Sequence, residues 1–184
     1  MNINTGAAAN SKVVIELFDD ICPKTCENFR QLCQGFQKTD TSGAKQPEIL
    51  GYSGSEFHRV VKGMYIQGGD LSKVFSKLIH RSKINSNIFS FLFTAKYKDG
   101  FSVYDGEFAD ESFQVKHTEP GLLGMCKRSS VQHTNECQFY VTLGAPLSFM
   151  DGQTVIFGRV IEGFRVFKLI EKMDTTNERP HPPV

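Results

Sequence analysis

FHRVVKGMYIQGGD, the run of residues 57–70, tells more about this chain than any other part of its sequence. It places Arg59 and Gln67 on either side of Gly63, among apolar side chains and before a Gly-Gly turn. We expect two strands joined by a bend at Gly63, with Arg59 and His58 on opposite faces of the first strand. The run has no nucleophile beside a base and no metal-ligand spacing. A site built here would act through one fixed cation, hydrogen bonds and an apolar wall.

Short strands and glycine-rich turns extend outward from this run. Residues 13–18 are rich in β-branched side chains and predict a strand. Pro23 suits the first turn of a helix that ends before Gly35, and residues 36–53 are predicted to be a loop. A second helix is predicted at 163–173. Further strands are predicted near 55–61, 64–67, 121–126, 138–143 and 154–160. This pattern favours a mainly β fold, either a closed barrel or a sandwich.

The composition limits the classes of function. The chain has 184 residues, enough for one domain with a sizeable core. Its 21 basic and 20 acidic residues give no basic field for nucleic acid or an anionic membrane. No apolar run reaches the ~20 residues that span a bilayer. Residues 1–6 lack the basic start and apolar core of a signal peptide, so a cytoplasmic location is expected.

Two of the five cysteines have a spacing that deserves a second interpretation. Cys22 and Cys26 lie four positions apart and could form a metal clip or a redox pair. No second Cys or His pair has zinc-finger spacing. The favoured interpretation is packing, because Cys26, Phe29, Leu32 and Cys33 recur at helical spacing and would form a buried stripe.

Five ordered motifs carry a family resemblance. They are residues 13–18 with 22–29, residues 57–70, residues 108–113, residues 121–125 with 135–140, and residues 157–163. Together they resemble the cyclophilins, the peptidyl-prolyl cis-trans isomerases. The Cys-Pro-Lys-Thr-Cys run starting at Cys22 and the Asn177–Pro180 run are similar to the branch called peptidyl-prolyl isomerase-like six.

The resemblance implies a closed antiparallel eight-stranded barrel capped by two helices. It implies a domain over residues 13–176, after a disordered stretch at 1–12 and before a Pro-rich tail at 177–184. Residues 72–98 exceed the family's short loop, either as a true insertion or as an intervening segment that was not removed. The family's first and last strands have no evident counterpart, so we expect unpaired sheet edges.

The resemblance also implies a chemistry. Arg59 matches the family's catalytic arginine, which donates to the prolyl nitrogen as the amide twists. Gln67 matches the glutamine that orders this arginine and the substrate carbonyl. The alternatives are a solvated or ion-paired Arg59 and a water-facing Gln67. The implied reaction needs no cofactor and no metal.

The implied proline pocket is less faithful to the family. Its residues are Met64, Tyr65, Cys126, Lys127, Gln138, Tyr140, Phe149 and Met150. Tyr140 stands at a usual Phe and brings a hydroxyl that needs a partner. Gln153 and Thr154 replace a Lys-His pair, so we expect weak or no cyclosporin binding. Ordinary core packing is the alternative for Met64, Tyr65, Tyr140 and Phe149.

One wall of the implied groove carries new charge. Lys127 and Arg128 replace small residues and are expected to favour acidic peptides or to obstruct the groove. Three hypotheses follow. The favoured one is an isomerase, of reduced activity, acting on proline-containing peptides or unfolded segments during protein folding. The others are a non-catalytic proline-peptide binding module on the same barrel, and an interrupted product with little stable function.

Overall fold

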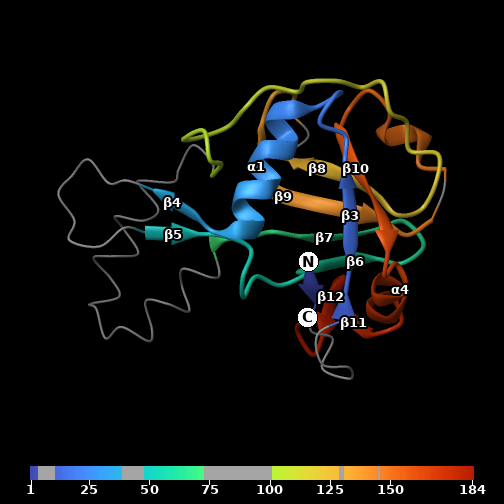
Figure 1. Cartoon of the computed structure of the whole chain (residues 1–184). Coiled ribbons are helices and arrows are strands. Elements are labelled where there is room, and N and C mark those ends of the chain that lie inside the picture. The colour runs from blue at the N-terminus through green and yellow to red at the C-terminus, as the bar shows by residue number, and fades with distance from the viewer. Residues whose placement is uncertain (4–10, 39–47, 73–100, 129–130, 145) are drawn as a thin grey trace.

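A computed structural model describes residues 1–3, 11–38, 48–72, 101–128, 131–144 and 146–184 (Figure 1). The proposed insertion at 72–98 lies, apart from Ser72, outside the described residues.

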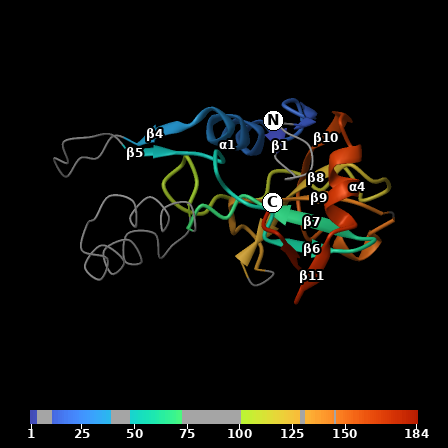
Figure 2. The same ribbon diagram turned by 90° about the horizontal axis from the view of Figure 1, so that it is seen from below.

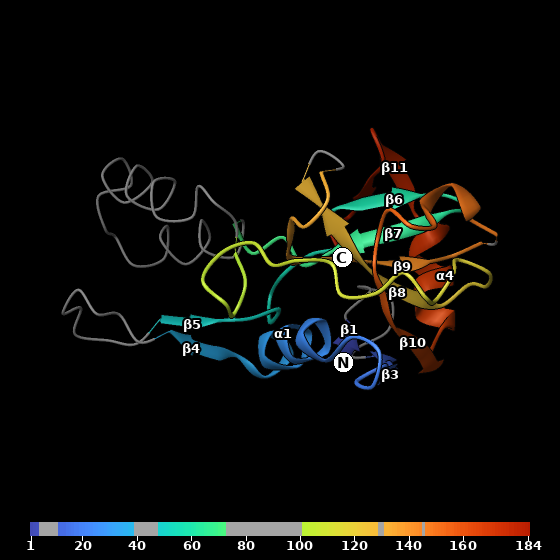
Figure 3. The ribbon, with the colours of Figure 1, turned by 90° about the horizontal axis from the view of Figure 1, so that it is seen from above.

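Six strands of the described part form one antiparallel sheet, in the order β3-β10-β8-β9-β7-β6. Their bounds are β3 Val14–Leu17, β6 Arg59–Val61, β7 Tyr65–Gly68, β8 Leu122–Lys127, β9 Asn135–Thr142 and β10 Ile156–Glu162. Figure 3 shows this order from β6 to β3. The mainly β class and the predicted strands are confirmed, and the sheet brings the 57–70 run beside β9.

Two α-helices lie within the described residues: α1 (Pro23–Gln34) packs against β9 and β10, and α4 (Arg165–Glu171) packs against β6. Figure 2 shows them well apart. Pro23 occupies the first turn of α1, and Gly35 ends it at a φ of 90°. Glu111, far along the chain, accepts from the Lys24 and Thr25 N–H groups at 2.9 and 2.7 Å. A carboxylate thus satisfies N–H groups that the first helical turn leaves unpaired.

Aromatic side chains form the core between α1 and the sheet. The Phe29 ring lies 5.2 Å from Phe139 and 5.3 Å from Phe157. Tyr52 is buried beside them and donates its hydroxyl to the Cys137 carbonyl oxygen at 2.6 Å. Tertiary packing of this kind orients α1 on β9, the strand that supplies part of the candidate site.

The cysteine prediction is confirmed for Cys26 and is wrong for Cys33. Cys26 is fully buried and its thiol donates to the Phe157 carbonyl at 3.3 Å. Burial raises the pKa values of Cys22 and Cys26 to about 12. Cys33 is exposed, and it lines a cavity together with Met1 and Asn2 instead of packing in the core.

The chain termini differ from expectation. After α4, β11 (Asp174–Thr176) and β12 (Arg179–His181) form a hairpin. Its Glu178 carbonyl accepts from Val60 N–H at 2.7 Å, and the Val184 carbonyl accepts from Phe57 N–H at 2.6 Å. The expected tail at 177–184 is therefore hydrogen-bonded to residues in and just before β6, with Pro180 buried. Figure 2 shows β11 beyond β6 at this edge.

Structure also occurs near the N-terminus and in the predicted loop. β1 (Asn2–Ile3) pairs with β2 (Ser11–Lys12), where disorder over 1–12 was expected, because Ile3 is buried in the core. Residues 4–10 lie outside the described part. β4 (Phe36–Lys38) pairs with β5 (Glu48–Leu50), where a loop over 36–53 was expected. Among the described residues, every helix is too short or too polar to cross a lipid bilayer.

Candidate functional site

The strands β6 and β7 set Arg59 directly opposite Gln67. The turn between the strands contains Gly63 at a φ of 76°, a conformation that glycine adopts without steric cost. Its N–H donates to Glu171 Oε1 at 2.8 Å, and Lys168 donates to the other carboxylate oxygen at 2.8 Å. Partial burial opposes ionisation of Glu171, but these two hydrogen bonds outweigh it and hold its pKa below the ordinary value. Helix α4 therefore holds in place the turn that sets Arg59 opposite Gln67.

The Arg59 guanidinium contacts both a carboxylate and an aromatic ring. Its Nε donates to Glu178 Oε2 at 2.5 Å, and its Cζ lies 5.6 Å from the centre of the Tyr65 ring. The hydrogen bond to Glu178 raises the pKa of Arg59. The Arg59 side chain remains 44% exposed and that of Glu178 46%. Arg59 is therefore ion-paired, as one alternative expected, and is still accessible to a ligand.

Gln67 is tied to the third predicted polar residue. Its Nε2 donates to Gln138 Oε1 at 2.8 Å, which joins β7 to β9 through side chains. The register also places Gln67 opposite Tyr140 on β9. The predicted Arg59, Gln67 and Gln138 thus form a row of polar side chains across β6, β7 and β9, called the polar edge below. Gln67 and Gln138 are both half-buried.

An apolar cluster adjoins this polar edge. Leu122, Tyr140 and Ile156 form its buried base. Partly buried side chains pack on that base, namely Phe18, Tyr65, Val115, Cys126 and Met150. The Tyr65 and Tyr140 ring centres lie 5.7 Å apart. The structure thus brings together four of the predicted pocket residues, Tyr65, Cys126, Tyr140 and Met150.

Tyr140 finds the hydrogen-bond partners that its hydroxyl requires. The hydroxyl lies 2.6 Å from His117 Nε2 and 2.7 Å from Thr154 Oγ1. His117 is buried, and its Nδ1 lies 2.7 Å from Asp151 Oδ1. A hydrogen bond from the His117 backbone N–H, followed by the one from its ring, lowers the pKa of Asp151.

Asp151 and the Tyr140 hydroxyl contact opposite nitrogens of the His117 ring, so the three side chains form one hydrogen-bonded chain. Burial raises the pKa of Tyr140 and keeps its proton in place. Glycine is required under the ring, because a Cβ on Gly124 would lie 2.1 Å from it. The tyrosine that replaces the family's usual Phe is therefore accommodated by one buried, fully paired chain of polar groups.

Lys127 does not lie where the sequence analysis expected it. Its side chain is 3% exposed and its ammonium donates to Asp110, itself 1% exposed, at 2.6 Å. The Phe113 ring covers the same ammonium at 5.4 Å. Burial opposes ionisation of Asp110, but the bonds from Lys127, Asn135 and His133 N–H lower its pKa. The prediction that Lys127 lines the groove as a positive charge is wrong, because its ammonium is buried and paired with Asp110.

Arg128 is likewise paired rather than directed at a groove. Its Nη2 donates to Glu136 Oε1 at 2.7 Å and lies 3.2 Å from Glu107 Oε1. These carboxylates cancel the second cation of the expected wall. Both cations of the expected wall therefore have carboxylate partners within the protein.

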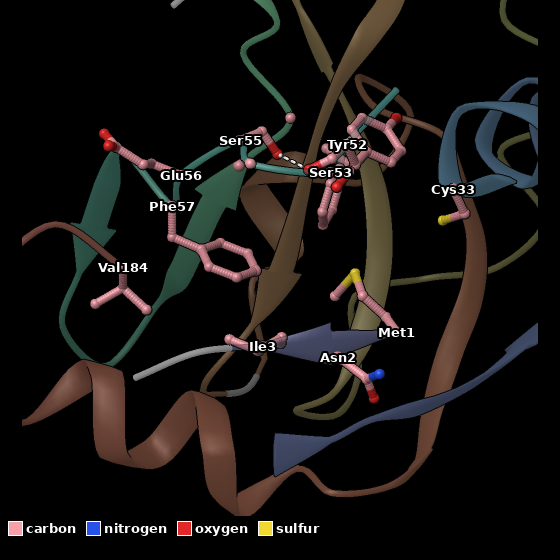
Figure 4. Close-up of a pocket in the computed structure, with 14 residues that line it drawn as sticks. Met1, Asn2, Ile3, Cys33, Tyr52, Ser53, Ser55, Glu56, Phe57 and Val184 are labelled. Atoms are coloured by element: carbon pink, nitrogen blue, oxygen red, sulfur yellow. Dashed lines mark hydrogen bonds between the residues drawn. The ribbon is translucent and has the colours of Figure 1, made fainter. Parts of the chain in front are cut away.

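Two other predicted residues lie outside the apolar cluster. Met64 is half-buried, and its carbonyl accepts from Leu143 N–H at 2.8 Å. Phe149, in the 3₁₀ turn η2 (Ser148–Met150), is 58% exposed. A separate cavity of about 540 Å³ opens where Ile3, Phe57 and Val184 converge (Figure 4). No predicted site residue lines that cavity.

Sequence reasoning missed three residues that shape the site, His117, Thr154 and Glu178. The need of a buried tyrosine hydroxyl for partners was a signal for the first two. Glu178 gave no signal, because it meets Arg59 only where the turn of the β11–β12 hairpin lies against β6.

Comparison with known proteins gives one consistent result. The family model described as "Cyclophilin type peptidyl-prolyl cis-trans isomerase/CLD" matches residues 1–184. "Probable inactive peptidyl-prolyl cis-trans isomerase-like 6" of Bos taurus is 38% identical over 169 residues, 92% of this chain and 46% of that protein. "Peptidyl-prolyl cis-trans isomerase 11" of Caenorhabditis elegans is 36% identical over 188 residues, 100% of this chain and 85% of that protein.

"NK-tumor recognition protein" of Mus musculus is 40% identical over 164 residues, 89% of this chain and 9% of that protein. The chain thus spans about half the length of the bovine relative and a small part of the murine one.

Proposed function

The chain belongs to the family of cyclophilin-type peptidyl-prolyl cis-trans isomerases, and from this premise we propose that it accelerates rotation about X–Pro bonds. The proposed substrates are exposed proline-containing peptide segments, including those of unfolded proteins. The single observation that carries the proposal is an accessible arginine above an apolar cluster, paired in register with a glutamine.

The physical chemistry of the reaction suits such a site. Rotation about an X–Pro bond breaks amide resonance and takes ~10–100 s without a catalyst at 25 °C. As the amide twists, the prolyl nitrogen becomes pyramidal and gains a lone pair. A guanidinium N–H that donates to this lone pair acts mainly in the transition state, which is the condition for acceleration.

Each part of the proposed site has a distinct role. Arg59 donates to the prolyl nitrogen. Gln67, held by Gln138, donates to the substrate carbonyl. Tyr65, Tyr140, Cys126 and Met150 hold the proline ring, with Phe149 at the margin. The rigid Tyr140 chain supports this assignment, because a wall that keeps its shape orients the ring while the carbonyl rotates.

Further elements of the proposal extend the family premise. We propose that the sheet curves into the family's eight-stranded barrel, with the β11–β12 hairpin beside β6. Protein folding in the cytoplasm is the proposed setting. Weak or absent cyclosporin binding is also proposed, and Thr154, which is held by Tyr140, supports it because it is engaged inside the wall.

A non-catalytic proline-peptide binding module is the second candidate. Two observations favour it. Glu178 neutralises Arg59 in the structure, and the bovine relative bears the printed name "probable inactive". A binding module needs the apolar cluster but makes no use of the arginine in a transition state.

NMR exchange between the cis and trans peaks of a short X–Pro peptide separates the two candidates. Wild-type protein and the Arg59→Ala variant are compared at equal concentration, with peptide shifts as the measure of binding. An isomerase accelerates exchange and loses that acceleration in Arg59→Ala while the peptide still binds. Peptide shifts without acceleration by the wild-type protein would reject the isomerase and leave the binding module.

A further inference from the structure

The turn between β11 and β12 contains a residue type that its backbone disfavours. Thr176 pairs with Arg179, so Asn177 and Glu178 form a two-residue hairpin turn. Their φ angles are 49° and 63°. Turns with positive φ at both positions favour Asn followed by Gly. A glutamate in the second position has a positive φ that is less favourable for it than for glycine. We therefore ask what its side chain contributes.

The backbone presents that side chain to β6. The Glu178 carbonyl accepts from Val60 N–H at 2.7 Å, which fixes the turn one residue from Arg59. The Glu178 carboxylate then receives the Arg59 Nε–H at 2.5 Å. The guanidinium also lies over the ring of Tyr65, a member of the apolar cluster. Glu178 and the apolar cluster therefore contact the same guanidinium.

We propose that Glu178 is an intramolecular competitor that restrains Arg59 from proline-containing peptides. The inference rests on the proposed function, since it assigns Arg59 as the group that such peptides engage. While Glu178 holds the guanidinium, one donor is occupied and the positive charge is largely cancelled. A peptide that engages Arg59 must displace the carboxylate or share the cation with it.

The competition is weak enough to be overcome. Both side chains are nearly half exposed, and ion pairs in such settings contribute little free energy. We expect removal of the Glu178 charge to strengthen peptide binding by about two- to five-fold. Because salt screens exposed charges, the difference between wild type and variant should narrow at high ionic strength. A purely structural role for Glu178 would give no such dependence.

The sequence offers a closely matched control. Arg159 Nε donates to Glu16 Oε2 at 2.5 Å, and the two side chains are 52% and 45% exposed. This pair joins β10 to β3, away from β6, with the same atoms and distance as the Arg59–Glu178 pair and with similar exposure. Glu16→Gln therefore removes an equivalent ion pair without touching the candidate site.

The test measures the dissociation constant of a proline-containing peptide by NMR titration, with exchange rates recorded in the same samples. The proteins are wild type, Glu178→Gln, Glu178→Asn and Glu16→Gln, each at about 20 mM and 500 mM salt. Asn tolerates positive φ and guards against a misfolded turn in the Gln variant. We expect both Glu178 variants to bind about two- to five-fold tighter at low salt, and Glu16→Gln to match wild type.

Repeating the substitution in the Arg59→Ala background completes the test. If Glu178 acts through Arg59, Glu178→Gln then leaves affinity unchanged. If both Glu178 variants that retain Arg59 bind the peptide no more tightly than the wild-type protein, the inference is overturned. If no form accelerates exchange, the proposed isomerase activity is rejected. The dissociation constants of the four combinations of Arg59 and Glu178 variants still test whether Glu178 competes with the peptide. Absence of binding by every form overturns both.

Discussion

Two basic residues predicted for one groove have opposite surroundings. Arg59, at the β6 edge, pairs with Glu178 while both side chains remain almost half exposed. Lys127, at the β8–β9 corner, pairs with Asp110 at exposures of 3% and 1%. Water competes for the first pair and not for the second. An exposed pair can be exchanged for a ligand at little cost, whereas breaking a buried pair strands a charge in the interior. The comparison supports the proposed binding role of Arg59 and a structural role for Lys127.

Removing the buried cation gives the largest expected effect on stability. In Lys127→Met the Asp110 carboxylate stays buried without its strongest partner. We expect the free energy of unfolding to fall by ~3–5 kcal/mol, measured by urea denaturation. The double variant Asp110→Leu with Lys127→Met should recover much of this loss, since no charge is then left unpaired. A loss below about 1 kcal/mol in the single variant would place Lys127 among exposed residues.

The hydroxyl beneath the apolar cluster should have an intermediate effect. Tyr140→Phe keeps the ring but leaves His117 Nε2 and Thr154 without this partner. We expect a loss of ~1–3 kcal/mol in unfolding free energy, because buried polar groups lose a hydrogen bond. Peptide affinity should change little, since the ring surface is retained. A stable variant that loses peptide binding instead would show that the hydroxyl contacts the ligand.

Lowering the pH should gradually destabilise the protein through three carboxylates that accept hydrogen bonds. The native pKa values of Asp110, Asp151 and Glu171 lie below the ordinary range. The unfolded chain then binds protons first as pH falls below about 4, so stability is present above that pH and is lost toward the lower native pKa values. For each extra proton that the unfolded chain binds, the free energy of unfolding falls by about 1.4 kcal/mol per pH unit. Chemical denaturation between pH 6 and pH 2 measures this slope, and Asp110→Asn should reduce it. An unchanged slope in that variant would remove Asp110 from the explanation.

Local patterns predicted the central sheet and α1 correctly. β-branched alternation located β3, β6 and β7, and Pro23 with Gly35 marked the two ends of α1. These features depend on neighbours in sequence. β1, β2, β12 and the β4–β5 pair escaped prediction, because each of these strands has only two or three residues and is too short to show an alternating pattern.

The candidate site divides in the same way. Arg59, Gln67 and Gln138 were placed in one site by the family resemblance, and the strand register and a Gln67–Gln138 hydrogen bond bring them together. The burial of Lys127 could not be foreseen, since its partner Asp110 belongs to a segment between strands. Glu178 was equally hidden, because a turn after α4 brings it to β6. Electrostatic partners across the fold decide whether a basic residue is available, and single-strand patterns carry no record of them.

One paired measurement tests the division of roles between these two residues most directly. The isomerisation rate of an X–Pro peptide and the free energy of unfolding are measured on wild type, Arg59→Ala and Lys127→Met. We expect Arg59→Ala to lose catalysis with a stability change within about 1 kcal/mol. Lys127→Met should lose stability while its folded fraction keeps the wild-type rate. Full catalysis by Arg59→Ala, or catalysis lost from folded Lys127→Met, would contradict this division.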